Sequence, residues 1–347
     1  MASIKDLAFE KASLLLCKGY TPEFIDGKTN IGYLGVLPAA LKKDLPKVEG
    51  NKKGVLNYTS LSVLYNKKRM VPFFSAYNID GKEEVNQAAR PAFRADPRIA
   101  SDIQLDKTFY NLVTGFTEFE IGHMASNNEM GRGPDGVLKA FQTFHFTNSA
   151  PQAERLNSGL WKGLETYVIR EAATVTTNKR ISVFTGPVLT SKDPAYVKRT
   201  SFRIPLLFFK VVVFMSKKGL YSTAFVMSHE KKMIEDNMFV RPAPTRSLAE
   251  NLTESGFFND FTYRRVFQVN IPFLEELSGL KFRWKGVKSI QVPEGKKMLE
   301  KIRQVGSAAD AQVSRSALRN PNRIVTTGQP SLTDLKRDNY SLNMVLP

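Results

Sequence analysis

The chain has 347 residues, 42% of them hydrophobic, which is enough for a large folded core and excludes a disordered chain. Its one cysteine, Cys17, excludes an intrachain disulfide and a zinc site built from several thiolates. The 50 Lys and Arg against 33 Asp and Glu give a formal charge of +17, which favours a polyanionic partner, nucleic acid first and an anionic membrane second.

The sequence shows no sign of a membrane span or a secretory signal. No apolar run approaches the ~18 residues that a spanning helix needs. Lys5, Asp6 and Glu10 precede a short leucine cluster, and no small-residue cleavage pattern follows it. We therefore expect no membrane association and a cytoplasmic location, with export by a signal-independent route left open.

The first 80 residues are expected to hold a helix, a connector and a hairpin. Ser3 suits an N-cap and Gly19 a stop, so a helix is predicted over 3–18. A stretch rich in Pro, Gly and Lys, residues 35–54, is interpreted as a connector. Two apolar runs around a polar turn then predict a hairpin, with its strands at 61–65 and 70–77 and its turn at 66–69.

The middle of the chain is expected to alternate loops with short elements. Two prolines and several charges predict a loop over 90–99, and three glycines predict another over 127–136. Alternation and apolar content predict strands over 116–121 and 143–147. Helical spacing of apolar residues predicts a helix over 151–173, with Pro151 in its first turn.

The second half should supply most of the buried strands. Runs of β-branched and aromatic residues predict strands over 181–185, 205–215, 220–227 and 267–271. A short helix over 272–277 should end at Gly279. Beyond residue 295 the sequence becomes polar and basic, with a helix expected over 296–305 and an extended tail over 314–347. The expected class is α+β, with a central, mainly antiparallel sheet and flanking helices.

The chemistry-bearing pattern begins at His123, one of only three histidines, in the sequence Glu120-Ile121-Gly122-His123. Asn148 follows, and then Asn157 and Glu165 on the predicted helix, about 80° apart around a regular helix axis. Amide and carboxylate oxygens suit Mg²⁺, Mn²⁺ or Ca²⁺, and a neutral imidazole beside such an ion can take a proton from water. Taken singly, each residue also fits an ordinary role, in a turn or beside a packed tryptophan.

Three ordered segments carry a resemblance: EIGH at 120–123, TNSAPQ at 147–152 and NSGLWKGLE at 157–165. They resemble the DNA/RNA non-specific endonucleases, the ββα-metal (His-Me finger) nucleases, whose patterns are D-R-G-H, T/S-N-x-x-P-Q and N-x-x-x-W-x-x-L-E. Matches in later strands extend the resemblance over roughly residues 55–285. It implies a nuclease domain over 56–290, between a helical N-terminal extension, 1–55, and a basic C-terminal extension or tail, 291–347.

The resemblance also implies the activity and the roles of the residues. The activity would be metal-dependent hydrolysis of DNA or RNA phosphodiesters with little sequence preference. His123 would be the general base, and Asn157 the direct ligand of one Mg²⁺, with Mn²⁺ or Ca²⁺ as alternatives. Glu165 would hold metal-bound waters. The supporting roles would fall to Glu120, which keeps the acidic charge of the first motif, to Asn148, which supports the catalytic loop, and to Arg90, which contacts phosphate.

One departure from the family pattern is Ile121, which stands where the family has an arginine. Losing one such donor typically slows turnover by ~10²–10³. Either another cation replaces it, with Arg94, Arg132 and Lys139 as candidates beside Arg90 for contacts with nucleic acid, or turnover is weak, or the protein binds without cutting. Because His123, Asn157 and Glu165 are all retained, we favour activity over a non-catalytic binding protein.

The remaining polar features are interpreted more simply. His145 is expected in the core or behind the site, and His229 at a strand end or on the surface. Basic pairs elsewhere are interpreted as solvated turns that could also line a phosphate track, at 67–69, 217–218, 264–265 and 296–297. An inhibitor or immunity protein is a further expected partner, because an unrestrained nuclease would damage its own cell. The resemblance also implies a possible homodimer, since members of the family often pair.

Overall fold

The computed structural model describes residues 3–84, 90–110, 119–153, 156–165, 168, 179–191, 193–229 and 266–291. The predictions for 296–305 and 314–347, and the basic pairs at 264–265 and 296–297, lie outside these residues. Among the described helices, none is long and apolar enough to cross a bilayer.

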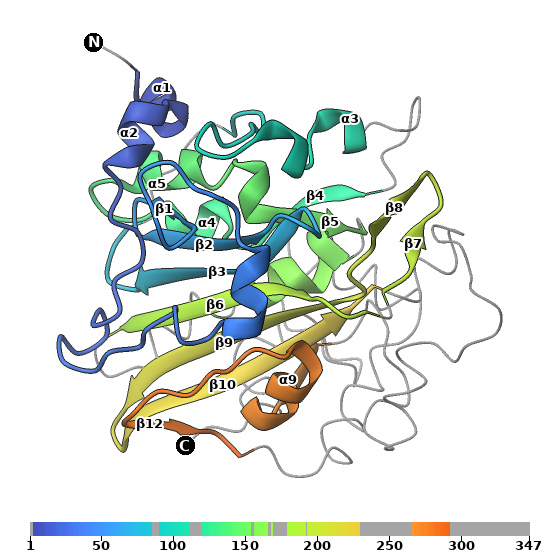
Figure 1. The fold of residues 1–347 in the computed structure, drawn as a ribbon. Coiled ribbons are helices and arrows are strands. Elements are labelled where there is room, and N and C mark those ends of the chain that lie inside the picture. The colour runs from blue at the N-terminus through green and yellow to red at the C-terminus, as the bar shows by residue number, and fades with distance from the viewer. Residues whose placement is uncertain are drawn as a thin grey trace, which may run out of the picture.

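An eight-stranded sheet organises the described part of the chain (Figure 1). Its strand order is β1-β2-β3-β6-β9-β10-β11, with β12 also pairing with β10. The β10–β12 pairing is parallel, whereas the other pairings in this sheet are antiparallel. The strands are β1 Val55–Tyr58, β2 Leu61–Asn66, β3 Val71–Asp80, β6 Arg180–Val188, β9 Leu207–Ser216, β10 Gly219–Ser228, β11 Val266–Val269 and β12 Val287–Ser289. The expected α+β class with a mainly antiparallel sheet is confirmed.

The strands that build the middle of this sheet are buried on both faces, which explains their nearly continuous apolar sequences. Along β9 the side chains alternate between two cores, because successive residues of a strand point to opposite faces. Phe208 and Val212 join the core on the face that carries Trp161, whereas Phe209 and Val211 join the core on the opposite face. The predicted strands over 205–215 and 220–227 are therefore confirmed.

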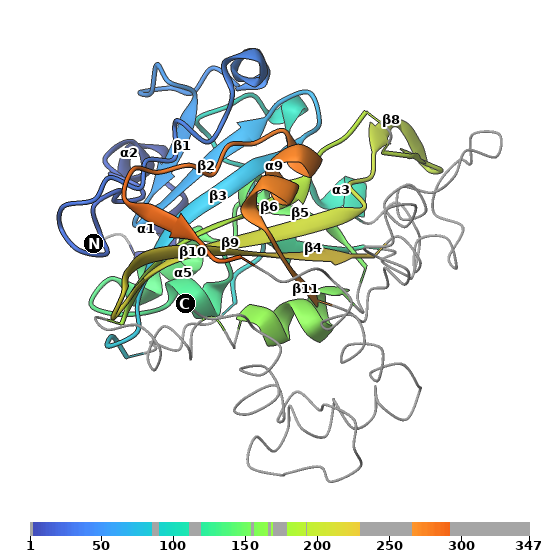
Figure 2. The ribbon, with the colours of Figure 1, turned by 90° about the horizontal axis from the view of Figure 1, so that it is seen from below.

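Helices and short strands cover the two faces of the sheet. Figure 2 shows α5 and α9 on opposite sides of it. The described α-helices are α1 Ile4–Phe9, α2 Lys11–Leu15, α3 Lys107–Tyr110, α4 Asn127–Met130, α5 Gly136–Gln142 and α9 Ile271–Ser278. Separate 3-10 turns lie at Ala39–Asp44, Ser101–Ile103 and Phe146–Asn148. Two small two-stranded sheets complete the described fold: β4 Glu120–His123 with β5 Ser149–Gln152, and β7 Ala195–Tyr196 with β8 Arg199–Arg203.

The predicted helix over 3–18 is wrong as a single element. It consists of α1 and α2, separated at Glu10, whose backbone is extended (φ −73°, ψ 131°). Ser3 forms the expected cap, in a reciprocal capping box with Asp6. The break lets Phe9 join a small core with Phe141, whereas Leu14 joins the main core.

Three predictions around the site are also wrong. Residues 143–147 do not form a strand; the chain turns there and enters the 3-10 segment Phe146–Asn148. The strand follows this segment as β5, Ser149–Gln152. Pro151 lies in β5, opposite Ile121, because the missing N–H is tolerated in a two-stranded ribbon. The helix starts only at Leu156, with a π turn over Leu156–Trp161. The predicted loop over 127–136 contains α4, which Ser126 caps.

Candidate active site

His123 ends β4 and lies between two aromatic rings. The centroid of its ring is 4.7 Å from that of Phe93 and 4.7 Å from that of Phe144, which meets it edge-on. The residue is only 6% exposed, and its Nε2 is enclosed without a hydrogen-bond partner among the residues that the structure describes. This burial lowers the pKa of His123 to about 3, and the charge of Arg90 contributes to the shift. The imidazole is therefore neutral at physiological pH, which is the form that accepts a proton.

Arg90 lies beside this ring cluster. Its guanidinium carbon is 5.9 Å from the centroid of Phe144, the ring that also contacts His123. The structure therefore brings the predicted base and the predicted phosphate-binding arginine to one aromatic side chain. An arginine near a neutral imidazole leaves a net positive site, which suits a phosphodiester anion.

Asn148 holds the chain where it leaves the base. Its Oδ1 accepts hydrogen bonds from Ser75 Oγ (2.8 Å) and the Ala125 amide (3.1 Å), while its Nδ2 donates to the carbonyls of Ala125 (2.9 Å) and Thr143 (3.0 Å). The side chain is fully buried, and both of its polar atoms are engaged in these bonds. Asn148 is thus placed to orient the segment after His123 rather than to bind a metal.

Asn157 and Glu120 meet across the short ribbon and helix. Asn157 Nδ2 donates to Glu120 Oε2 at 2.8 Å, while its Oδ1 accepts no hydrogen bond from the described residues. Gln152 lies opposite Glu120 in the β4–β5 register, and its amide packs over Gly122 so closely that a Cβ there would overlap it. Both amide atoms of Gln152 are buried and unpartnered within the described part of the chain.

Glu165 belongs to a second cluster beneath the first. Its side chain is half-buried, and burial together with the nearby Glu129 raises its pKa, whereas Lys210 opposes that rise. Lys210 is fully buried; its Nζ donates to Glu129 Oε1 and to Tyr77 Oη, both at 2.8 Å. The same ammonium lies 5.4 Å from the centroid of Trp161.

Lys210 and Glu129 were not among the residues expected at the site. The signal for Lys210 was visible in the sequence, because it is a single charge inside the apolar run predicted as a buried strand over 205–215. A buried lysine needs a carboxylate partner. Nothing in the spacing identified that partner as Glu129, which lay in a segment interpreted as a loop.

The side chains of the three candidate replacement cations, Arg94, Arg132 and Lys139, contact groups other than the aromatic rings around His123. Arg94 places its guanidinium carbon 4.9 Å from the ring centroid of Phe9, on α1. Arg132 Nη1 donates to the Glu83 carbonyl at 2.9 Å, and Lys139 Nζ lies 3.8 Å from Glu83 Oε2. The last two therefore share one acidic residue that the sequence did not single out.

The other two histidines are structural. His145 is fully buried, with ring centroids 4.9 Å from those of Phe9 and Tyr58, and its Nδ1 lies 2.9 Å from the Gln142 carbonyl. The core interpretation of His145 is confirmed. His229 directly follows β10, which confirms the expected strand end, but it is buried, so the surface alternative is wrong. It accepts from the Ala153 amide at Nδ1 (3.1 Å) and meets the Pro205 carbonyl at Nε2 (2.7 Å), which fixes the approach to the Asn157 helix.

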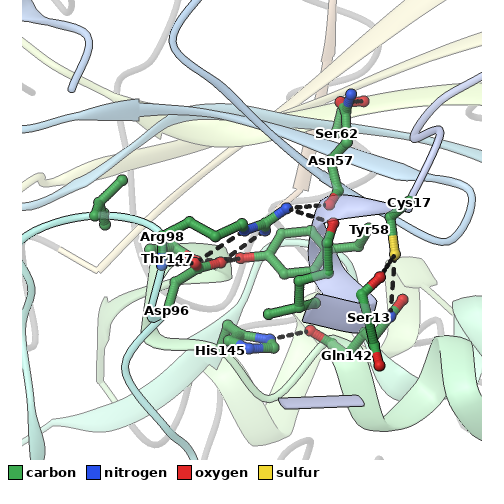
Figure 3. Close-up of polar contacts among 12 residues, drawn as sticks. Ser13, Cys17, Asn57, Tyr58, Ser62, Asp96, Arg98, Gln142, His145 and Thr147 are labelled. Atoms are coloured by element: carbon green, nitrogen blue, oxygen red, sulfur yellow. Dashed lines mark hydrogen bonds and ion pairs between the residues drawn. The ribbon is translucent and has the colours of Figure 1, made fainter. Parts of the chain in front are cut away.

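A buried polar network supports the turn that carries Asn148 (Figure 3). Asp96 forms an ion pair with Arg98 (2.7 Å), and Tyr58 Oη links Asp96 (2.6 Å) to Thr147 (2.7 Å). Arg98 Nη1 also donates to the carbonyls of Leu14 and Asn57. This arrangement ties the N-terminal helices, the first strand and the Asn148 turn to one another.

The donor set of the site fits a hard divalent cation. The Oδ1 of Asn157 accepts no hydrogen bond from the described residues, and the carboxylate of Glu120 lies beside it, bonded to Asn157 Nδ2. Within the described ranges, no group of three or more His, Cys, Asp or Glu residues is arranged to bind a metal. An ion held through so few protein atoms keeps most of its ligands as water, which is the usual manner of Mg²⁺.

The chain is similar to one known family and to individual known proteins. The family model of the DNA/RNA non-specific endonucleases matches residues 44–289. A protein of Sinorhizobium fredii (strain NBRC 101917 / NGR234), named "Uncharacterized protein y4fB", is 31% identical over 276 residues, which are 76% of this chain but only 39% of that protein. A solved structure described as "Crystal structure of the EndoG/EndoGI complex: Mechanism of EndoG inhibition" aligns with a TM-score of 0.46 and 19% identity, over 65% of this chain and 84% of that chain.

The family match covers most of the chain and contains all three motif segments, so the resemblance seen in the sequence is confirmed. The chain belongs to the DNA/RNA non-specific endonuclease family.

Proposed function

We propose that this chain is a metal-dependent endonuclease that hydrolyses DNA or RNA phosphodiesters with little sequence preference. One observation carries the proposal: the neutral, enclosed imidazole of His123 shares the ring of Phe144 with Arg90. Contacts with phosphate contain no base information, which is consistent with a lack of sequence preference. The formal charge of +17 adds a general attraction for a polyanion.

His123 would act as the general base. It takes a proton from the attacking water as the water oxygen bonds to phosphorus, and the bond from phosphorus to the leaving oxygen breaks to give a 5′-phosphate end. A base whose pKa is held near 3 is weak in the free protein. The phosphodiester anion brought against the ring raises the pKa of His123, because it favours the imidazolium form.

Asn157, with Glu165 holding ordered water, would bind the divalent cation, and Glu120 orients Asn157 through their hydrogen bond. The family is divalent-metal dependent, and we propose Mg²⁺ as the ion on the basis of the oxygen donors. When bound, it stabilises the charge that develops on the phosphorane and the leaving oxygen. Asn148 positions the base by holding the backbone at Ala125.

Arg90 is the cation that compensates for Ile121 in this proposal. Ile121 pairs with Pro151 and supplies no donor, whereas the charge of Arg90 already acts on His123. Arg94, Arg132 and Lys139 contact other groups, so we assign them to binding of the strand rather than to the reacting phosphate. The division at residues 55 and 290 also stays a proposal.

The experiment compares the full-length protein with His123→Ala and Asn157→Ala on plasmid DNA and on a long RNA. We expect cleavage with Mg²⁺, none with EDTA, and a loss of about 10²-fold or more in each variant. Thermal unfolding of each variant identifies a loss that comes from misfolding. Metal-independent cleavage, or full activity of a folded His123→Ala protein, would refute the assignment. Tight binding by the wild type without any cleavage would instead show a binding protein.

We further propose that an inhibitor or immunity protein restrains the activity in the cell, and, separately, that the chain forms a homodimer. The reason is chemical, since an enzyme without sequence preference attacks its host's nucleic acid. Light scattering of the purified chain tests the dimer, and expression of the active chain next to its His123→Ala variant tests the need for restraint. Equal growth of both strains, with active enzyme in the lysate, would argue against that need.

A further inference from the structure

Two cations and one carboxylate meet beside α4 and α5. Arg132 lies two residues after the end of the short helix α4, and Lys139 lies in α5. Both face Glu83, which lies just beyond the end of β3. The side chain of Lys139 is 11% exposed and that of Glu83 is 35% exposed, and Arg132 is half-buried, so solvent reaches the cluster.

The carboxylate of Glu83 is poorly bound by these cations. Its Oε2 lies 3.8 Å from Lys139 Nζ, which is beyond hydrogen-bond distance. Arg132 Nη1 donates to the main-chain carbonyl of Glu83, and among the described residues the Nε of Arg132 is enclosed without a partner. A charged donor without an acceptor is costly, and this one lies next to an anion that does not satisfy it.

Gly133 makes the position of the carboxylate possible. Its φ is +72°, and a Cβ at Gly133 would overlap the Glu83 carboxylate. The anion therefore lies directly on the backbone between the two cations. The Gly133 N–H itself donates to the Glu84 carbonyl at 3.2 Å, so the glycine contributes room rather than a donor. An anion site beside Arg and Lys is suited to phosphate, which offers more acceptor oxygens than a carboxylate and pairs well with a guanidinium.

We propose that Arg132 and Lys139 form a phosphate-binding subsite for a nucleic-acid strand, in the space left by the missing side chain of Gly133, and that Glu83 occupies it when no strand is bound. The inference deepens the proposed nuclease function and rests on it. Strand binding then exchanges one anion for another: the Glu83 carboxylate leaves the cradle for solvent, and a backbone phosphate takes its place. Removing the Glu83 charge should therefore strengthen binding, provided that both cations are present.

The experiment measures binding of a fluorescent 20-nucleotide DNA in EDTA, so that cleavage cannot occur, across a series of salt concentrations. The variants of the full-length protein are Glu83→Gln, Arg132→Gln with Lys139→Gln, and all three together. Glu49→Gln is the matched control, because Glu49 is an exposed carboxylate paired with Lys11 and its removal changes the net charge equally. Lys139→Gln alone serves if the double cation variant unfolds.

We expect Glu83→Gln to bind about 3- to 10-fold more tightly than the wild type and Glu49→Gln to change the affinity less than 2-fold. The cation variants should bind more weakly, with a salt slope reduced by about 0.7 for each lost single-strand phosphate contact. In the triple variant the gain from Glu83→Gln should vanish. A gain that persists there, or that Glu49→Gln matches, overturns the subsite. Cleavage is measured separately: an uncleaved but more tightly bound strand would refute the nuclease and leave the subsite intact.

Discussion

The substitution Lys210→Met tests how much the buried ammonium group of Lys210 contributes to the stability of the fold through its partners Glu129 and Tyr77. In the wild type, its Nζ donates to Glu129 and Tyr77 at 2.8 Å each, with no side-chain exposure on either member of the ion pair. Methionine conserves most of the volume but leaves Glu129 as an uncompensated buried charge. Breaking a buried pair in this way costs about 3–5 kcal/mol of unfolding free energy, whereas loss of the Tyr77 bond alone would cost about 1 kcal/mol.

Urea denaturation followed by tryptophan fluorescence measures this loss, and the double variant Lys210→Met with Glu129→Gln separates its causes. If the unpaired carboxylate dominates, the double variant should recover more than half of the lost stability. Lys218→Met, at an exposed position in the turn before β10, is the matched control and should stay within about 0.5 kcal/mol of the wild type. A loss below 1 kcal/mol in Lys210→Met, or a double variant less stable than the single one, would refute the reasoning.

Two further predictions concern the immediate surroundings of the base. Gly122→Ala should lower the unfolding free energy by about 1–3 kcal/mol and reduce cleavage, because its Cβ would overlap the buried Gln152 amide. Gly35→Ala is the control, since a Cβ at Gly35 meets open space, and it should change neither stability nor cleavage. Equal thermal midpoints of the two variants would contradict this reasoning. Burial lowers the pKa of His123 to about 3 and that of His229 to about 4, so the unfolded chain binds protons first as pH falls below about 6.5. Stability should decrease between pH 6.5 and pH 4 by up to about 1.4 kcal/mol per pH unit for each histidine, and His123→Ala should show a shallower decrease in urea titrations than the wild type. Parallel curves for the two proteins would show that His123 is not buried as described.

The sheet could be predicted because its strands are defined by local pattern. Residues 181–185, 205–215 and 220–227 are apolar and β-branched over lengths that fit a buried strand, and the turn before Gly219 separates two of them. Gly279 was identified as a helix stop, and it has the left-handed conformation (φ 71°) typical of that position. These features are determined by residues close together in the sequence, so they can be predicted from the local sequence alone.

The parts that could not be predicted depend on contacts between distant residues. Residues 143–147 alternate like a strand, yet Asn148 bonds the Thr143 carbonyl and Ser75 on β3, and these contacts bend the segment into a turn. The helix of Asn157 begins with a π turn after Ala153 meets His229, 76 residues away. The assumption of a regular helix, on which the 80° separation of Asn157 and Glu165 rests, therefore fails in its first turn.

The candidate site shows the same division. The spacing of the motifs identified His123, Asn148, Asn157 and Glu165 as candidate site residues. The structure adds which groups lie next to each of these side chains. The partnership of Glu83 with Arg132 and Lys139 spans about 50 residues and has no signature in the local sequence. The ion pair of Lys210 with Glu129 spans 81 residues. The single lysine within an apolar strand was the one feature of the sequence that indicated it.

The guanidinium of Arg98 has a practical consequence for anyone who wishes to isolate the shared family region. The homologous stretch begins at residue 44, yet Arg98 Nη1 uses the carbonyl of Leu14, and Tyr20, Ile31 and Leu37 fill the core beneath the sheet. A fragment that begins at residue 44 would lack the Leu14 carbonyl that the buried Arg98 guanidinium uses, and it would expose the apolar core residues on this face of the sheet to water. Such a fragment should precipitate, which makes the evolutionary boundary a poor guide to where the autonomous folding unit starts.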